Sequence, residues 1–181
     1  MRGVPIVVDI NVLLAAVVSG DEDATFESFP SPPPVHGDPN ATAIGILNDA
    51  HEAALWLSPH ILDGVRRVLT RRDGFGWDRA NAERYCAILE RIAARSGGGV
   101  IRPRVRVNDC DDWEDNRILE LAVASGALLI LSNDDDLQRM SPWRGIPVLS
   151  ARDFVTRIDV IRRAAVRGRP NPFLAGPRSR R

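Results

Sequence analysis

Short aliphatic runs separated by helical patterns most constrain how this 181-residue chain can fold. Val4–Val8, Ala127–Leu131 and Ile146–Leu149 are dominated by aliphatic residues, without the alternation of a strand that faces water on one side. Between them lie segments whose apolar residues recur with helical spacing. Continuous aliphatic strands that alternate with helices are typical of a parallel sheet covered by helices on both faces. The sequence therefore predicts an α/β fold, a three-layer α/β/α sandwich around a short central parallel sheet.

Helix start and stop signals place the other elements. Ser58 is a favoured N-cap residue and Pro59 a favoured first helical residue, and the apolar residues that follow keep helical spacing through Leu69. Gly126 is expected to close a later helix. Along the chain we expect helices at 11–18, 41–54, 59–69, 78–95, 112–125 and 150–165, with a short strand at 55–57 and an extended segment at 100–107.

Two segments differ in composition from the rest of the chain. Ser19–Asn40 is acidic and holds five of the 13 prolines, which favour extended backbone over helix, so a flexible insertion is expected there. Residues 160–181 carry seven arginines and no acid. The sequence thus predicts one domain over residues 1–158, interrupted by the insertion at 19–40, and an Arg-rich tail at 159–181.

Composition excludes several classes of function. The formal net charge is zero, so no overall field favours nucleic acid. All 24 basic residues are arginines, which rules out mechanisms that need a lysine. Cys86 and Cys110 fit neither a zinc pattern nor a disulfide scaffold. No apolar run is long enough for a membrane span and the first residues do not resemble a signal peptide, so a soluble cytoplasmic protein with no membrane partner is expected.

Acidic residues follow two of the expected strands. Asp9 comes directly after Val4–Val8, and Asp134 comes shortly after Ala127–Leu131. Because ligands of parallel α/β sheets bind beyond the carboxyl ends of the strands, we expect these two carboxylates to meet at one edge. Asp115 and Asp63 lie in the first turns of two helices and can add to the same cluster.

Three further residues near this cluster are expected to support it. Asn11 follows the first strand, and Ser132 can orient the carboxylates by a hydroxyl contact. The strand period of two places Ser132, Asp134 and Asp136 on one side, with Asp135 opposite. Asp136 is therefore expected to be an additional metal ligand, and Asp135 to face water.

Converging carboxylates repel each other strongly unless a cation lies among them. Mg²⁺ or Mn²⁺ prefers such oxygen ligands and binds phosphate oxygens through its remaining positions. Such an ion can activate water and stabilise the leaving oxygen of a phosphodiester. We therefore expect Asp9, Asp63, Asp115 and Asp134 to hold Mg²⁺ or Mn²⁺.

These acids also fit roles that need no catalytic metal. Each of Asp9, Asp63 and Asp115 lies where an acid favours the start of a helix. A calcium loop would use Asp109, Asp111, Asp115 and Glu120, but Glu114 stands where the required glycine belongs. A phosphatase with an aspartyl nucleophile would need an acid at the position of Asn11 and typically a lysine.

Four segments resemble the PIN-domain family, in particular the VapC-like toxin ribonucleases of toxin–antitoxin pairs. They are "VVDINVLL" (Val7–Leu14), "LSPHILDGVRRVL" (Leu57–Leu69), "DDWEDNRILELAVASGALLILSNDDDL" (Asp111–Leu137) and "IPVLSARDF" (Ile146–Phe154). The resemblance implies a PIN-like fold and a metal-dependent endoribonuclease. It also implies the catalytic residues Asp9, Asp63, Asp115 and Asp134, a cognate antitoxin protein and a homodimer.

One residue departs from the family pattern. Asp63 stands where the family usually has Glu, so its carboxylate falls about 1.5 Å shorter by ordinary bond lengths. This departure keeps two alternatives open. The chain can be a PIN-fold protein that binds RNA or protein with weakened catalysis, or a PIN nuclease that is not a toxin.

Overall fold

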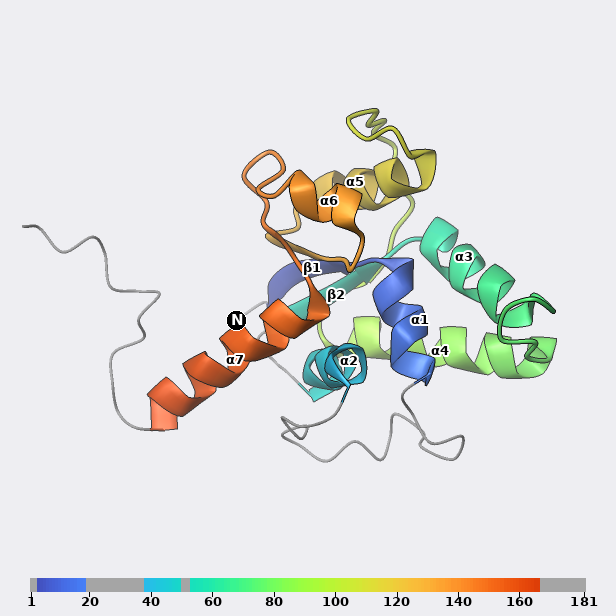
Figure 1. The fold of residues 1–181 in the computed structure, drawn as a ribbon, viewed down its shortest axis with the longest axis horizontal. Helices are drawn as coiled ribbons and strands as arrows, with labels where there is room; N and C mark the ends of the chain where they lie inside the picture. The colour runs from blue at the N-terminus through green and yellow to red at the C-terminus, as the bar shows by residue number, and fades with distance from the viewer. Residues whose placement is uncertain (1–2, 19–37, 50–52, 167–181) are drawn as a thin grey trace, which may run out of the picture.

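Five parallel strands form the centre of the fold in a computed structural model of the chain, which describes residues 3–18, 38–49 and 53–166 (Figure 1). The sheet order is β3-β2-β1-β4-β5. Each strand is parallel to its neighbours, which places all five carboxyl ends at one edge. The strands are β1 (Val4–Val8), β2 (Ala53–Leu57), β3 (Gly99–Val100), β4 (Leu129–Leu131) and β5 (Val148–Leu149).

Helices cover both faces of this sheet. In Figure 1, α5 and α6 lie above the sheet, whereas α2 and α4 lie below it, and α5 packs on β1 and β2. The predicted three-layer α/β/α arrangement is therefore confirmed. The helices are α1 (Ile10–Val18), α2 (Pro39–Asp49), α3 (Pro59–Thr70), α4 (Arg79–Arg95), α5 (Trp113–Ser125), α6 (Asp135–Arg139) and α7 (Ala151–Val166).

The predicted helix boundaries that depend on a cap are confirmed. Ser58 and Asp78 precede α3 and α4, and each side chain accepts a hydrogen bond from a backbone N–H of its helix. Asp112 does the same for α5, which ends at Gly126 with φ 63°. Glycine adopts this left-handed conformation at no steric cost, which explains why the helix stops there.

Several predicted boundaries are wrong. Ala53 and Ala54 belong to β2 rather than to a helix over 41–54, because they pair with Val4 and Pro5 of β1. The helix before them begins at Pro39, inside the predicted insertion, where Asp38 accepts hydrogen bonds from two backbone N–H groups. Of the segment 100–107, only Val100 is in a strand.

The carboxyl end of β4 also differs from the prediction. Instead of a continuing strand that alternates sides, the chain turns into the short helix α6, with Asp134 as its N-cap. The side chain of Asp134 accepts hydrogen bonds from the next turn, so the chain becomes helical and the side chains no longer alternate as in a strand. Residues 19–37 of the predicted insertion and 167–181 of the predicted tail lie outside the described residues, and α7 continues past residue 158 to Val166.

The buried core explains why the carboxyl edge is held in place. Side chains from β1, β2 and β4, such as Val7, Leu55 and Ile130, are completely buried between the helical layers. Gly98 lets β3 approach β2 closely, since a Cβ atom there would collide with the backbone of Leu55. None of the helices in the described part of the chain combines the length and apolar character needed to cross a bilayer.

Candidate active site

Asp9 and Ser132 form the buried centre of the predicted site. Asp9 ends β1, and its backbone N–H donates to the carbonyl oxygen of Leu131 in β4, 2.8 Å away. Ser132 is fully buried, and its hydroxyl donates to Asp9 Oδ2 at 2.6 Å. The hydroxyl contact expected from the sequence is therefore present, and it fixes the orientation of the Asp9 carboxylate.

The polar residue Asn11 links the same two strand ends. Its Nδ2 group is 3.5 Å from the Ser132 hydroxyl oxygen, and its Oδ1 atom accepts from the backbone N–H of Asn133 at 3.2 Å. Asn133 in turn accepts from the backbone N–H of Ala151 at the start of α7. Asn11 thus joins the ends of β1 and β4 and supports the position that the sequence predicts for it.

Asp134 is held beside Asp9 by the backbone of the turn after β4. Its N–H donates to the Ser132 hydroxyl oxygen at 2.9 Å. Its Oδ1 atom accepts from the N–H groups of Asp136 and Leu137 in the first turn of α6. Its second oxygen accepts no hydrogen bond from any residue that the structure describes, so this oxygen remains available to a ligand.

Asp115 approaches the cluster from the first turn of α5. Helix capping does not explain it, because Asp112 is the N-cap and accepts from the N–H of Glu114. Instead, the Cys110 thiol donates to Asp115 Oδ2 at 3.4 Å. The other carboxylate oxygen of Asp115 has no hydrogen-bond partner within the described ranges.

The pKa values of Asp9 and Asp115 respond to burial and to the charges of neighbouring carboxylates. Burial raises the pKa of Asp9, the hydrogen bond from Ser132 opposes the rise, and the charge of Asp134 adds to it. Burial also raises the pKa of Asp115, to about 6; the Cys110 contact opposes this, and the charges of Asp134 and Asp9 add to it. Asp9, Asp115 and Asp134 therefore form one acidic cluster, which we call the carboxylate cluster.

Asp63 and Asp136 do not join their side chains to this cluster. The Asp63 side chain is 73% exposed and forms an ion pair with Arg66 at 2.6 Å, one turn along α3. The Asp136 side chain is 58% exposed and pairs with Arg139 at 2.6 Å in α6. Both acids lie close to the predicted site in the chain, but in the structure each faces an arginine of its own helix.

Cys110 is the contact residue that the sequence pattern missed. Its backbone N–H and carbonyl oxygen both bond to the side chain of Asn116, which is buried in α5. This double contact holds Cys110 against the first turn of the helix, where its thiol reaches Asp115. The only signal in the sequence is an asparagine directly after the acid, since Cys110 itself lies outside any periodic segment.

The acids that a calcium loop would use contact different partners in the structure. Asp109 accepts from the indole N–H of Trp143 and pairs with Arg144. Glu120 is buried and accepts from the N–H of Val107. These contacts leave no common centre for Asp109, Asp115 and Glu120, so a calcium loop does not account for the acids.

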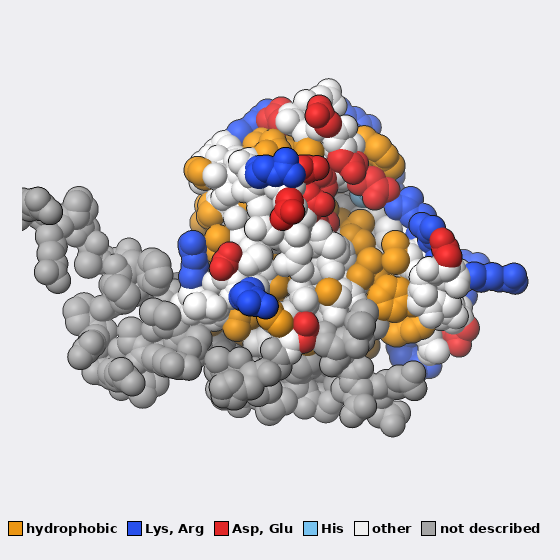
Figure 2. Space-filling view, in the orientation of Figure 1, with side chains coloured by type: hydrophobic (Ala, Val, Ile, Leu, Met, Phe, Trp, Pro, Cys, Tyr) orange, Lys and Arg blue, Asp and Glu red, His pale blue; other side chains and the backbone are white. Residues whose placement is uncertain are grey.

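Asp115 and Asp134 of the carboxylate cluster are partly exposed, whereas Asp9 is buried. Figure 2 shows acidic side chains gathered over α5 and α6, with basic side chains on either side. A hollow of about 380 Å³ lies farther along, lined by Asp38, Pro39, Asn40, Asn133, Gln138, Ser150, Ala151 and Arg152. It contains none of the clustered carboxylates. An open acidic surface suits a long substrate better than a small molecule, which is usually enclosed.

The donor chemistry of the cluster fits a hard divalent cation, although its present geometry does not yet enclose one. The charges that most affect Asp115 are other carboxylates, and Asp115 and Asp134 each keep an unpartnered oxygen. Among the described residues, however, no three His, Cys, Asp or Glu side chains are positioned to hold one ion.

The raised pKa of Asp115 predicts how stability depends on pH without metal. The folded state binds the proton more tightly than the unfolded state, whose pKa is near 3.8, so the free energy of unfolding decreases as pH rises toward about 6. The amide of Asp115→Asn cannot ionise, so the variant does not lose this free energy of unfolding as pH rises. In EDTA, urea unfolding should show the variant gaining stability over the wild type between pH 5 and pH 7.5.

A matched control, Asp73→Asn, is expected to change stability in the opposite direction. Asp73 is exposed, and its pKa is lowered by the hydrogen bond from Arg71. Asp73→Asn should therefore lose a little stability at pH 7.5 rather than gain it. An Asp115→Asn variant that is no more stable than the wild type at pH 7.5 would contradict the raised pKa of Asp115.

Comparison with known families identifies the class of protein. The family model of the PIN domain matches residues 5–136, well over half of the 181-residue chain. The chain therefore belongs to the PIN-domain family, whose members are generally nucleases that hydrolyse phosphodiester bonds. No curated protein matches the chain.

Proposed function

We propose that this PIN-domain protein is an endoribonuclease that depends on Mg²⁺ or Mn²⁺ and cleaves cytoplasmic RNA. One observation carries the proposal: Asp9, Asp115 and Asp134 come together at the carboxyl edge of the sheet, where burial and neighbouring carboxylate charge raise the pKa values of Asp9 and Asp115. A divalent cation among them would offset this effect by favouring the ionised forms. The partly exposed positions of Asp115 and Asp134 support a polymeric substrate.

The residues have separate roles in this proposal. Asp9 is the fixed ligand, because Ser132 and the backbone of β4 hold it. Asp115 and Asp134 each offer an oxygen that accepts no hydrogen bond within the described chain. When bound, the metal ion would activate the attacking water and neutralise charge on the phosphodiester.

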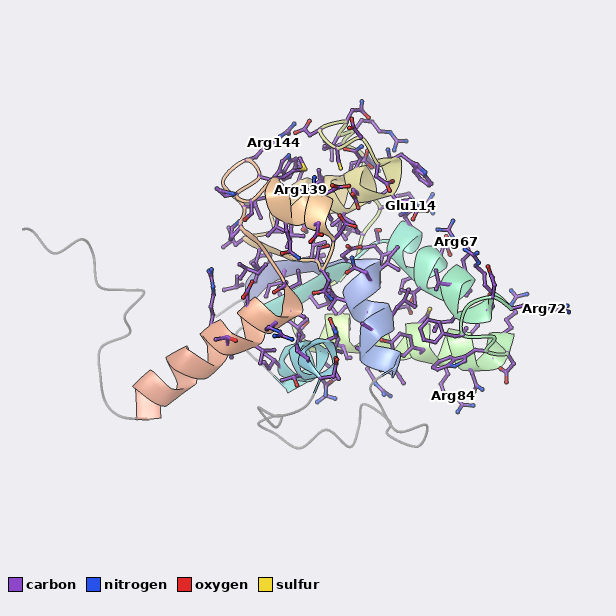
Figure 3. The ribbon with its side chains drawn as sticks, viewed as in Figure 1. Arg67, Arg72, Arg84, Glu114, Arg139 and Arg144 are labelled. Carbon is purple, nitrogen blue, oxygen red and sulfur yellow. The ribbon has the colours of Figure 1, made fainter. Side chains whose placement is uncertain are left out.

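Arginines near the cluster support an anionic substrate. In Figure 3, Arg139 lies on α6 to one side of the acidic surface and Arg67 on α3 to the other. Each is more than half exposed and paired with a carboxylate that a phosphate can replace. The Arg-rich tail at 159–181 is a further proposed phosphate contact, which lies mostly outside the described residues.

Cleavage of labelled RNA tests the proposal. RNA should be cut with Mg²⁺ or Mn²⁺, the reaction should stop in EDTA, and excess metal should restore it. A DNA oligonucleotide of the same sequence is the control for substrate class. Cleavage that survives EDTA would contradict metal dependence, and cleavage of DNA alone would contradict the ribonuclease proposal.

A toxin role and its partners extend this proposal. We propose that the chain acts as a homodimer and is inhibited by a cognate antitoxin that covers the carboxylate cluster; the support is the resemblance of the four motifs to VapC-like toxins. The neighbouring reading frame tests it. A small adjacent gene whose product binds this chain and blocks cleavage is expected, whereas its absence favours a PIN nuclease that is not a toxin.

A second candidate is a PIN-fold protein that binds RNA or protein with weakened catalysis. Asp63 faces Arg66 rather than the cluster, and the described carboxylates do not enclose an ion. Calorimetric titration with Mn²⁺ separates the candidates. Binding well below millimolar concentration favours the nuclease, whereas millimolar or absent binding without RNA cleavage favours the binding protein.

A further inference from the structure

Trp113 is an exposed aromatic side chain in the first turn of α5, the turn that also holds Asp115. It is 57% exposed, and the other exposed large hydrophobic residues of the described chain are aliphatic. It is the first residue of α5, two positions before Asp115. A large indole so exposed buries little of its surface in the core and leaves much of it accessible to a ligand.

His60 packs against this indole from the neighbouring helix. The two rings meet edge to face, with centroids 5.3 Å apart and planes at 67°. Burial lowers the pKa of His60, which keeps the imidazole neutral at pH 7. His60 therefore supports the indole as an uncharged aromatic neighbour.

The ring pair bridges the two helices that carry acids of the predicted site. His60 lies one turn before Asp63 on the same face of α3, and Trp113 belongs to the turn of α5 that holds Asp115. Beside it, Arg67 of α3 and Glu114 of α5 form an ion pair at 2.7 Å, and Figure 3 shows them directed toward each other. These contacts hold the ring pair between the amino ends of α3 and α5, the helices that carry Asp63 and Asp115.

We infer that Trp113, supported by His60, is a stacking platform for one base of a single-stranded RNA whose backbone crosses the carboxylate cluster. The inference rests on the proposed ribonuclease function and adds how the substrate is held. Every base has a π face, so an exposed indole binds single strands with little sequence preference. Paired bases within a duplex cannot present that face, so the platform favours unpaired RNA.

Fluorescence anisotropy of a labelled 12-nucleotide single-stranded RNA tests the inference. All proteins carry Asp115→Asn, which prevents cleavage, so binding is measured whether or not the chain is a nuclease. Trp113→Ala should raise Kd by roughly 5- to 100-fold, the range expected for loss of one base stack. Trp113→Phe, which keeps an aromatic face, should stay within about threefold of the parent.

Two controls separate stacking from general damage. Leu128 is 62% exposed before the amino end of β4, at the edge opposite the carboxylates, and Leu128→Ala should leave Kd unchanged. Placing an abasic nucleotide at successive positions should remove the effect of Trp113→Ala at one position. Circular dichroism and thermal unfolding check that each variant is folded.

The outcomes distinguish this inference from the proposed activity. If RNA binding depends on Trp113 but the wild type cleaves no RNA, the stacking platform is supported and the proposed nuclease activity is wrong. Cleavage by the wild type with unchanged binding by Trp113→Ala would reject the platform alone. Equal weakening for abasic and intact RNA at every position, or an indole that matters only for binding a protein partner, would also overturn it.

Discussion

Asp9→Asn is expected to reduce RNA cleavage by about 100-fold or more, because even the outer contacts of a metal ligand are typically worth 10- to 100-fold. The amide is nearly the same size as the carboxylate, so Ser132 can still donate to its oxygen. The negative charge needed to hold the cation is lost. Since burial already opposes ionisation of Asp9, the variant should fold at least as stably as the wild type in EDTA.

Asp63 provides the contrasting case for this measurement. Its carboxylate is exposed and paired with Arg66, so Asp63→Asn should change the cleavage rate only a few-fold. Asp63→Glu adds about 1.5 Å of reach and should raise the rate if a longer side chain can turn toward the cluster. Equal losses for Asp9→Asn and Asp63→Asn would mean that Asp63 leaves Arg66 to bind the metal.

Glu120→Ala is expected to destabilise the fold by about 3–5 kcal/mol, the usual cost of breaking a buried ion pair from one side. The Glu120 side chain is 3% exposed and bonds to Arg117 at 2.8 Å and to the N–H of Val107 at 3.2 Å. Its removal leaves Arg117 without this partner, and the Arg117 Nε atom is already buried without one. Urea unfolding measures the loss.

The same helix supplies the control for Glu120. Glu114 pairs with Arg67 at 2.7 Å, but both side chains are substantially exposed, so Glu114→Ala should cost no more than about 1 kcal/mol. If Glu114→Ala and Glu120→Ala lower the free energy of unfolding by the same amount, burial does not set the strength of the Glu120 contacts. Glu120 also anchors the segment that leads to Cys110, so its loss should slow cleavage through a less ordered Asp115.

The sequence predicts the parts of the site that local patterns determine. Asp9 and Ser132 directly follow aliphatic strands, and parallel strands end at one edge of a sheet, so their meeting follows from the strand pattern. The N-caps Ser58, Asp78 and Asp112 can also be predicted, because each directly precedes a segment with helical spacing of apolar residues. Each of these predictions needs only neighbouring residues and one rule of sheet geometry.

Other features depend on which of two possible local structures a residue adopts, and the strand pattern does not decide between them. Asp134 can continue a strand or cap a helix, and its two hydrogen bonds to the next turn decide for α6. Ala53 and Ala54 favour helix by themselves, yet pairing with β1 places them in β2. The direction of Asp63 depends on Arg66, a partner one turn away that no carboxylate motif specifies.

The hydroxyl bridge from Ser132 to Asp9 joins residues 123 positions apart in the chain. During synthesis, β1 leaves the ribosome long before β4, so Asp9 at first has neither its hydroxyl donor nor the neighbouring Asp134. A nascent chain therefore has no complete carboxylate cluster until most of the domain has been made. For a protein that cleaves RNA, this order of assembly would keep the site incomplete until the ribosome has made the segment that contains β4.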